Sequence, residues 1–375
     1  MLDIIQSGFH YVWSFALIIS IIVFVHEGGH FLVARLCGVK VEVFSIGFGR
    51  EILGRTDRHG TRWKISLWPL GGYVKMYGDA GAASTPDNAL MSDMSDADKK
   101  RSFHHQPLWA KSLIVAAGPA ANFILAIAVF TYFIFTVGLS STQPVVGEIV
   151  PKSPAEMAGL QTGDRIIRID TRTVKTFNDI PEALLTNLGT PVQLHIVRGE
   201  KTFDLTITPT TIEEKDALGN TQKRPLIGIR SQKITYENVG LLAAVAAATE
   251  RTYDMCVTSL HVLGQMIAGK RSTDDLKGPL GIAKLSGDVT SQGDTTGQTL
   301  RMILWFVALL SVNLGLVNLF PIPMLDGGHL LFYCIEGLRG RPLAERVQEY
   351  SFRFGVALIG SLMALSLFND VRQML

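Results

Sequence analysis

The stretch SFALIISIIVFVHEGGH (residues 14–30) joins a long apolar run directly to three ionisable side chains. From Ile4 to Val25 the sequence contains no Asp, Glu, Lys or Arg. A helix needs about 20 mostly apolar residues to cross the hydrocarbon core of a bilayer. A cleaved signal peptide would begin with basic residues, and residues 1–10 hold none. We therefore expect residues 1–36 to form a membrane-spanning helix that carries the ionisable side chains near one end.

Three later segments have the same uncharged, apolar character. They are Leu113–Leu139, Met302–Leu325 and Phe354–Asn369. We expect the corresponding spanning helices at residues 109–139, 301–336 and 350–370. Of the 375 residues, 47% are hydrophobic and 18% are charged, whereas soluble domains carry about a quarter charged residues. This composition excludes a disordered chain, a coiled coil and a basic nucleic-acid-binding protein. It predicts a polytopic α-helical membrane protein with four transmembrane helices.

The positions of lysine and arginine predict how these helices are oriented. Cytoplasmic loops are rich in these residues close to the ends of the spans. Residues 37–108 contain Lys40 and a basic cluster at 99–101, and the segment between the last two spans is also basic. Its arginines are Arg339, Arg341, Arg346 and Arg353. We therefore expect both segments to lie in the cytoplasm, and both termini and residues 140–300 to lie on the opposite side of the membrane.

The segments between the spans differ in character. Residues 37–78 alternate apolar and polar residues between glycines, which is typical of β-hairpins, and we expect these hairpins to associate with the membrane. Residues 79–106 are rich in Ala, Ser, Asp and Pro and predict a mobile loop. Residues 143–233 alternate strand and helix patterns and predict one inserted α+β domain. Residues 236–300 predict amphipathic helices on the non-cytoplasmic surface and a connector.

The pentapeptide His26-Glu27-Gly28-Gly29-His30 matches the pattern H-E-x-x-H. Histidines four residues apart lie roughly 40° apart around a helix and about 6 Å apart along it, so both imidazoles can reach one metal ion. Glu27 stands beside them, where it can take a proton from a water molecule activated by zinc. The pattern can occur by chance in a loop, but ionisable residues at membrane depth are costly and usually functional. We therefore expect His26 and His30 to bind one Zn²⁺ per chain, with Glu27 as the catalytic base.

A catalytic zinc usually has three protein ligands and one open position. The sequence NLFPIPMLDGGH (residues 318–329) closes the third span and offers Asp326 and His329 as further ligands. We favour Asp326, because a carboxylate completes a set of two histidines and one carboxylate, and His329 is the alternative. Pro321 and Pro323 must break the helix here and free backbone groups. At membrane depth such a break is tolerated only inside protein or beside a watery cavity.

Together these motifs resemble the site-2 protease family of intramembrane zinc metalloproteases (peptidase M50), in particular its bacterial RseP-type members. The likeness covers nearly the whole chain. The matching segments, in order, are HEGGH (26–30), GGYVKM (71–76), GPAANF (118–123), GPLGIA (278–283), SVNLGLVNLFPIPMLDGGHL (311–330) and FND (368–370). The resemblance implies zinc ligation by His26, His30 and Asp326 and base catalysis by Glu27.

The resemblance also implies how substrate is held and where the protein works. Residues 37–78 match membrane-associated β-elements that present the substrate as an added strand. The implied substrate-binding residues are Gly71, Gly72, Tyr73, Asn318, Pro321 and Pro323. An Asn318 amide that serves packing alone is the alternative for that residue. The implied location is the bacterial inner membrane, with the termini in the periplasm and the active site near the cytoplasmic side.

Residues 143–233 resemble a PDZ domain, with SPAEMAGLQTGDRI (153–166) as the signature. The best-known RseP-type enzymes carry two tandem PDZ domains, and this chain has room for one. We expect the single domain to lie in the periplasm and to contact substrates or admit only trimmed ones. A plain spacer is the alternative.

The expected activity is that of a zinc endopeptidase that cuts the transmembrane segments of single-pass membrane proteins, such as trimmed anti-sigma factors or signal-peptide remnants. The lipid bilayer is the other expected partner, and no nucleic acid is expected. Two other classes stay open: a membrane PDZ scaffold or binding protein with a structural metal site, and a metal-ion transporter. Glu27 argues against both, because a structural site needs no base beside its ligands. A transporter would also carry polar residues along several spans.

Overall fold

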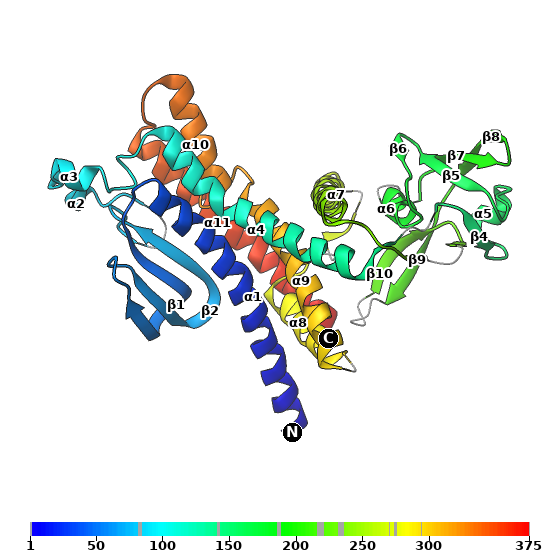
Figure 1. Cartoon of the computed structure of the whole chain (residues 1–375), viewed down its shortest axis with the longest axis horizontal. Helices are drawn as coiled ribbons and strands as arrows, with labels where there is room; N and C mark the ends of the chain where they lie inside the picture. Colours follow the sequence, from blue (N-terminus) through cyan, green and yellow to red (C-terminus); the bar gives the residue numbers. More distant parts are fainter. Residues whose placement is uncertain are drawn as a thin grey trace. The chain divides into compact units, whose positions relative to one another are not determined.

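The computed structural model describes residues 2–81, 85–140, 143–185, 189–215, 221–231, 236–269, 271–273, 276–293 and 295–374. The chain divides into two compact units. The first consists of Met1–Phe130 with Leu276–Leu375, and the second of Thr131–Asp275. The first unit is therefore built from two distant parts of the chain, coloured blue to cyan and yellow to red in Figure 1.

Four helices in the described part of the chain are long and apolar enough to cross a membrane. They are α1 (Leu2–Leu36), α4 (Leu108–Val137), α9 (Thr296–Asn318) and α11 (Glu345–Met374), all visible in Figure 1. Apolar side chains on their surfaces are open, and Trp13, Ile124 and Phe354 are 63%, 66% and 64% exposed. Exposed apolar surface of this kind marks a contact with something other than water, as a membrane-spanning helix requires. The structure thus supplies the four candidate spans that the sequence predicts.

The third expected span, residues 301–336, is interrupted. Where we expected one helix, α9 ends at Asn318 and a separate helix, α10 (Asp326–Arg339), follows. Pro321 and Pro323 lie in the interval between them. A proline inside a helix removes a backbone hydrogen bond and its ring clashes with the preceding turn. The break therefore makes Asp326 the first residue of a new helix.

Two glycines allow the turn between α9 and α10 to fold back on the start of α10. A Cβ on Gly327 would lie 2.3 Å from the carbonyl oxygen of Leu319, and one on Gly328 would lie 2.4 Å from that of Ile322. Real Cβ atoms do not approach backbone oxygens this closely, so any larger residue would push the turn away. The two glycines after Asp326 thus fix where its carboxylate lies.

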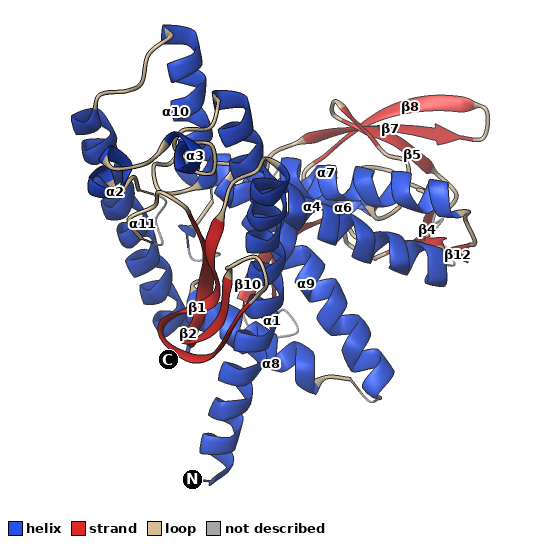
Figure 2. Cartoon of the chain, turned by 60° about the vertical axis from the view of Figure 1, so that its left-hand side comes forward, coloured by secondary structure: helices blue, strands red, loops and turns tan. Residues whose placement is uncertain are grey.

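Strands β1 (Val41–Thr56) and β2 (Arg62–Met76) form one long, bent hairpin, drawn in red in Figure 2. Because the strands bend, residues 43–46 lie opposite residues 72–75 on one side and residues 62–65 on the other. Within the described residues, 72–76 pair with β1 alone and form an edge of the sheet. The sequence predicted hairpins in this segment, and the structure has one with several register shifts.

Two parts of this hairpin have different surroundings. Near α1, Phe44 is 1% exposed and packs its ring against those of Phe31, on α1, and Trp63, at centroid distances of 5.7 and 4.5 Å. Elsewhere in the strands, Leu53 and Trp68 are 65% and 60% exposed. Exposed apolar side chains on the strands suit the membrane association that the sequence predicts, which stays a prediction.

Residues 79–106, expected to be a mobile loop, contain the short helices α2 (Asn88–Ser92) and α3 (Asp96–Lys99). Asp79 is 1% exposed and accepts hydrogen bonds from the backbone N–H of Met76 and from Nε2 of His104, both at 2.8 Å. This contact fastens the two ends of the segment to each other. The mobility of the segment stays a prediction.

Helix α8 (Pro279–Ser291) packs along α1. Gly287 permits the close approach, because a Cβ there would lie 1.8 Å from Cδ1 of Tyr11. The Tyr11 hydroxyl donates a hydrogen bond to Asp288 Oδ1 at 3.1 Å. Through these contacts the first part of α1 packs against α8, which lies more than 270 residues later in the chain.

Asp370 of α11 caps the start of α8. Its carboxylate accepts hydrogen bonds from the backbone N–H groups of Gly278 at 3.0 Å and Gly281 at 2.9 Å, which are donors that the first turn of a helix leaves free.

We expected residues 236–300 to be surface helices and a connector. The structure instead places α8 in the first unit, and α9 already begins at Thr296.

The second unit contains the α+β domain that the sequence predicts. Its elements are β4 (Val146–Ile149), α5 (Pro154–Met157), β5 (Arg165–Ile169), β6 (Arg172–Thr173), α6 (Asp179–Leu185), β7 (Val192–Arg198), β8 (Lys201–Ile207), β9 (Thr210–Lys215), β10 (Thr221–Leu226) and β11 (Ile229–Ser231). A four-stranded sheet has the order β6-β5-β7-β8, and β4 pairs with β11. The short strands β3 (Leu139–Ser140) and β12 (Tyr236–Glu237) pair at the ends of the domain.

The local patterns in this domain follow the sequence. Ser153 caps α5 by accepting a hydrogen bond from the backbone N–H of Glu156, and Pro154 is the first helical residue. β7 and β8 form the predicted hairpin. The core consists of alternate strand residues and one face of α6. Its most buried members include Val146, Ile166, Ile180, Leu194, Ile196 and Ile207.

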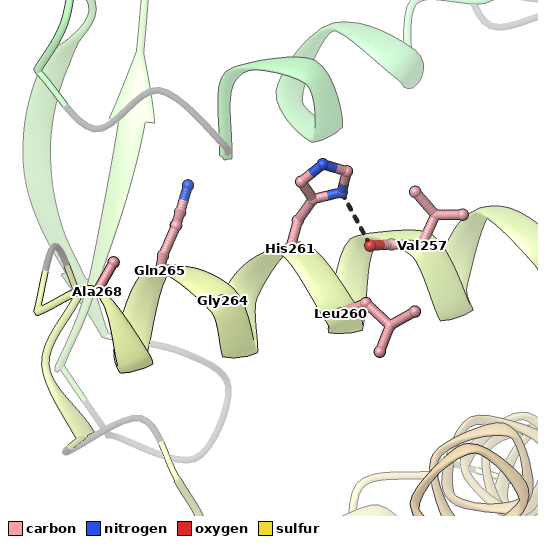
Figure 3. A pocket seen from close by; sticks show the side chains of 6 residues that line it. All are labelled: Val257, Leu260, His261, Gly264, Gln265 and Ala268. Atoms are coloured by element: carbon pink, nitrogen blue, oxygen red, sulfur yellow. Dashed lines mark hydrogen bonds between the residues drawn. The ribbon is translucent and has the colours of Figure 1, made fainter. Parts of the chain in front are cut away.

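Helix α7 (Leu241–Ile267) follows the domain, as the amphipathic pattern predicts. Its apolar side chains Leu242, Tyr253 and Ile267 are 86%, 68% and 80% exposed. Figure 3 shows a hollow along its C-terminal half, where His261 Nδ1 hydrogen-bonds the carbonyl oxygen of Val257 in the preceding turn at 3.0 Å. All the lining residues come from α7 and the residue after it, so the hollow is an open helix surface and not an enclosed site.

Candidate metal centre

The two histidines of H-E-x-x-H lie on one face of α1, one turn apart. Both His26 and His30 are 8% exposed, and their Nε2 atoms are 3.3 Å apart. Their rings meet edge to face with centroids 4.9 Å apart. Two imidazole nitrogens at this separation suit one shared metal ion, as the spacing in the sequence predicts.

The helix break brings Asp326 to these histidines. Its Oδ2 lies 3.2 Å from Nε2 of His26, and its Oδ1 lies 3.5 Å from Nε2 of His30. Atoms from all three residues lie within 4.8 Å of one another. His329, the alternative third ligand, is not part of this group of described residues. The arrangement agrees with Asp326 as the predicted third ligand.

Helix α4 forms the wall behind the histidines, and it can do so only because of small residues. A Cβ on Gly118 would lie 2.2 Å from Nε2 of His30 and 2.9 Å from Cε1 of His26. On α1, a Cβ on Gly29 would lie 2.2 Å from the carbonyl oxygen of Ala117. By contrast, a Cβ on Gly28 would meet nothing within 4 Å. The site therefore depends on Gly118 and Gly29 for space, and not on Gly28.

A carbonyl group of α4 orients His30. Its Nδ1 lies 2.8 Å from the carbonyl oxygen of Ile114, and since a carbonyl can only accept, Nδ1 carries the hydrogen. The neutral ring then has its lone pair on Nε2, which faces Asp326 and His26. Metal-binding histidines usually have their second nitrogen fixed in this way.

An amide of α4 orients His26. Asn122 is fully buried, and its amide group lies 3.1 Å from Nδ1 of His26. The nitrogen and oxygen of an amide are assigned by their hydrogen bonds, not by shape. Metal binding through Nε2 requires the hydrogen on Nδ1, so the amide oxygen of Asn122 must face the ring when a metal is bound. On α9, Ser311 Oγ donates to the backbone carbonyl oxygen of Asn122 at 2.9 Å and holds this turn of α4 in place.

The three predicted ligands have the chemistry that a divalent zinc ion requires. Asp326 Oδ2 is buried without a hydrogen-bond partner, although Nε2 of His26 is close by. With the hydrogen of each ring on Nδ1, both Nε2 lone pairs would face this carboxylate, and a cation between them would satisfy all three groups. Two histidines and one carboxylate form a common catalytic zinc set with a fourth position left for water. The residues therefore fit the ion.

Glu27 lies in the same cavity, which has a volume of about 650 Å³. Val74, on the edge segment of β2, lines the same cavity. Gly72 makes room for Glu27 beside this edge, because a Cβ there would lie 2.7 Å from Cγ1 of Val23 and 3.3 Å from Cγ of Glu27. The edge of the sheet thus lies directly against the residue that we predict to be the base.

The residues predicted to bind substrate divide into two groups. Gly71, Gly72, Tyr73 and Asn318 line the cavity with the ligands and Glu27. Pro321 and Pro323, both within the described residues, are not part of its lining; Pro323 instead packs its carbonyl against α11, where a Cβ on Gly355 would lie 1.8 Å from it. His329 also lines the cavity. The roles of all these residues stay predictions.

A comparison with protein families matches the description "Peptidase family M50" over residues 14–362. The chain belongs to peptidase family M50. A protein of Rhizobium meliloti named "Putative zinc metalloprotease R01501" is 40% identical over 362 residues, which cover 96% of this chain and 95% of that protein. "Metalloprotease MmpA" of Caulobacter vibrioides is 37% identical over 377 residues, which cover 96% and 95% of the two chains.

Among solved structures, the PDZ domain of the SdrC-like protein of Listeria monocytogenes is similar to part of the chain. The likeness covers 25% of this chain and 90% of that domain, with 24% sequence identity and a TM-score of 0.20. The family and its relatives make this chain a zinc metalloprotease with candidate membrane-spanning helices. The predicted family and enzyme class are therefore confirmed.

The sequence predictions missed the supports of the histidines. Gly118 and Asn122 belong to the segment GPAANF, which was noted only as a point of resemblance. An available signal was Asn122 itself, since a polar amide inside an apolar span needs a partner there. The carbonyl of Ile114 gave no signal, because every residue carries one.

Proposed function

We propose that this zinc metalloprotease is an intramembrane endopeptidase that cleaves transmembrane segments of other membrane proteins. The observation that carries the proposal is the position of Glu27 and both histidines on α1, inside the candidate span Gly8–Leu36. A cavity of about 650 Å³ surrounds them and is lined mostly by apolar side chains. A hydrolytic site built into such a helix suits peptide bonds that are themselves in the membrane.

The chemistry divides between the metal and Glu27. Zinc held by His26, His30 and Asp326 supplies Lewis acidity that makes water a nucleophile near neutral pH. Glu27 accepts the proton of the attacking water and returns it to the nitrogen of the leaving peptide. Glu27 lines the cavity beside the edge segment of β2, where Gly72 leaves room for its side chain. Asn122 and the carbonyl of Ile114 keep the imidazoles in the orientation that ligation requires.

The edge segment of β2 is the proposed guide for substrate. A transmembrane helix must unwind before its peptide bond can be attacked, and the freed N–H and C=O groups need partners at membrane depth. Residues 72–76 pair with β1 on one side, and Gly72 and Tyr73 line the cavity. An unwound substrate segment can add to this edge as a further strand. Asn318, at the end of α9, is a proposed second contact.

The proposed substrates are single-pass membrane proteins, including trimmed anti-sigma factors and signal-peptide remnants. The test uses purified enzyme in lipid vesicles with a single-span substrate, and compares wild type, Glu27→Gln and wild type with a chelator. We expect cleavage by wild type alone, a loss of at least about 10²-fold in Glu27→Gln, and unchanged zinc content in that variant. Cleavage by Glu27→Gln at the wild-type rate would reject Glu27 as the base. If the protein binds zinc but shows no cleavage that a chelator abolishes, the result would favour the scaffold with a structural metal.

The segment 143–233 is proposed to be a periplasmic PDZ domain that selects substrates by size. It interrupts the chain between the second and third candidate spans. A reporter active only outside the cytoplasm should work when fused near residue 200 and fail near residue 90. Deleting residues 145–232 behind a flexible linker should leave zinc binding intact and permit cleavage of an untrimmed substrate. If the deleted and full enzymes discriminate equally between two substrate lengths, the domain is a spacer or a ligand-binding module.

A further inference from the structure

A second, strongly basic cavity lies at the C-terminal end of α1. It has a volume of about 280 Å³ and is separate from the metal centre. Its lining residues are Arg35, Gly38, Val39, Lys40, His59 and Arg101. They come from the last turn of α1, the link to β1, the turn between β1 and β2, and the loop after α3. Arg35 and Lys40 thus meet Arg101, more than 60 residues away in the sequence, at one hollow.

The charges of this basic cavity have no acidic counterpart. Among the residues that the structure describes, Arg35, Lys40 and Arg101 form no ion pair with Asp or Glu. The Asp57 carboxylate of the nearby hairpin turn is already occupied by the backbone N–H groups of His59 and Thr61 and by the indole N–H of Trp63. The cavity therefore presents a concentrated positive charge.

Other contacts position these cations without neutralising them. Arg35 donates a long hydrogen bond of 3.4 Å to the hydroxyl of Thr61 and lies over the ring of Phe31. Lys40 lies 4.9 Å from the centre of the ring of Tyr77. The backbone N–H of Lys40 donates to the carbonyl oxygen of Arg101 at 3.0 Å, which fixes the two basic residues beside each other. The positions are thus built into the fold.

The end of α1 does not require these cations as caps. Basic side chains often neutralise the free carbonyl groups at the end of a helix. Here the carbonyl oxygens of Val33, Ala34 and Arg35 accept hydrogen bonds from the backbone N–H groups of Cys37, Val39 and Gly38. The backbone itself therefore satisfies three of the carbonyl groups at this end of the helix, and the positive charge is left for another group.

The position of the cavity favours a lipid as its ligand. It lies where the candidate span Gly8–Leu36 ends. On the last turns of α1, Leu32 and Leu36 are 59% and 77% exposed, so an apolar surface leads up to the cations. A phospholipid presents this combination, with a phosphate above and acyl chains below. Basic pockets at the ends of spans are known to suit anionic head groups.

We propose that this basic cavity binds the phosphate of an anionic phospholipid, with Arg35, Lys40 and Arg101 as its ligands. The single negative charge of the phosphate offsets part of the charge of the three cations, and the lipid chains lie along the apolar side of α1. Arg35 lies five residues beyond His30 on the same helix, and Phe31 between them packs against the sheet. A bound lipid therefore holds the end of α1 that carries the metal ligands against β1 and β2.

The test compares the full chain in nanodiscs of phosphatidylcholine alone and of phosphatidylcholine with phosphatidylglycerol. The pocket variant is Arg35→Gln/Lys40→Gln/Arg101→Gln. The matched control, Arg339→Gln/Arg341→Gln/Arg346→Gln, removes the same charge from residues outside the cavity. Native mass spectrometry counts the phosphatidylglycerol that each protein retains, and thermal unfolding measures its effect on stability. We expect wild type and control to retain the lipid and unfold at a higher temperature with it.

We expect the pocket variant to retain at least about 10-fold less phosphatidylglycerol and to lose the stabilisation, because charge-assisted contacts to phosphate are the strong ones. Equal loss in the control would show a general charge effect and overturn the proposal. Stabilisation of wild type by inorganic phosphate in phosphatidylcholine nanodiscs, to the same extent as by the lipid, would assign the cavity to a soluble anion instead. If the triple variant does not fold, Arg101→Gln alone is measured, and full lipid retention by it would reject the site.

Discussion

Two carboxylates, the buried Asp164 and the partly buried Asp326, show how a polar group that serves the fold differs from one that serves a ligand. Asp164, in the second unit, is fully buried and accepts hydrogen bonds from Nε and Nη2 of Arg198, both at 2.7 Å, and from the backbone N–H of Gln161 at 2.8 Å. Every donor that it needs comes from its own domain. The cluster is complete as it stands.

Asp326, in the first unit, has a different environment. Its Oδ2 is buried without a hydrogen-bond partner, and the Nε2 atoms of His26 and His30 lie 3.2 Å from Oδ2 and 3.5 Å from Oδ1. His30 already has its hydrogen on the opposite nitrogen. Burying a polar group without a partner is costly, so a site left incomplete by the protein indicates that another group completes it. The contrast separates structural from ligand-binding polar clusters more sharply than burial does.

The largest expected effect is the loss of a ligand. His26→Ala, His30→Ala and Asp326→Ala should each bind no zinc at stoichiometric concentration and show no cleavage, because two ligands rarely hold a catalytic zinc. His329→Ala is the control, since it lines the same cavity and lies outside the ligand group. Zinc content after gel filtration is the measurement. Retention of zinc by Asp326→Ala together with loss in His329→Ala would assign the third ligand to His329.

The second prediction compares two glycines. Gly118→Ala should lose zinc and activity, because its Cβ would occupy the space at Nε2 of His30, 2.2 Å away. Gly28→Ala, inside the pentapeptide itself, should keep both, because a Cβ there meets nothing within 4 Å. Alanine also favours helix over glycine. If the two variants have the same zinc content, the close contact between α4 and α1 is not what shapes the site.

The third prediction concerns Asn122 as a positioning residue. Asn122→Leu should weaken zinc binding by roughly 10–100-fold, the usual cost of removing a group that orients a ligand. Asn122→Asp should retain more affinity, because it keeps an oxygen that accepts from Nδ1 of His26. Competition with a zinc indicator measures the affinity without reference to cleavage. Equal affinities for wild type and the leucine variant would show that packing alone orients His26.

The smallest expected effect on the metal centre comes from changing Asp164 and Arg198 in the second unit. Arg198→Met should lower the unfolding temperature of the second unit, because Asp164 then keeps a single donor in a buried position. The double variant Asp164→Leu/Arg198→Met should be closer to wild type, since it removes both charges. Protease resistance on heating measures both, and zinc content should not change. A loss of zinc in Arg198→Met would contradict the separation of the two clusters.

Much of the fold and of the candidate site could be predicted from local patterns. The apolar runs predicted the four candidate spans, and Ser153-Pro154 predicted the start of α5, because caps and spans depend on neighbouring residues. The interruption of the third span was foreseen at Pro321 and Pro323, but the expected range still treated 301–336 as one helix. The assignment of α8 to the first unit was not foreseen, because its partners Tyr11 and Asp370 are far away in the sequence.

The candidate spans could be predicted from the amino-acid sequence alone, and so could a metal hydrolase, from the spacing of His26, Glu27 and His30. These features follow from composition and from the fixed geometry of a helix. The packing of the helices brings Asp326, and not His329, to the two histidines, and it sets Asn122 and Gly118 against them. Those contacts join α1, α4 and α10, whose residues are some 80 to 300 positions apart. No local sequence pattern predicts these contacts, because they form only when the helices pack together and the proline-containing turn folds back.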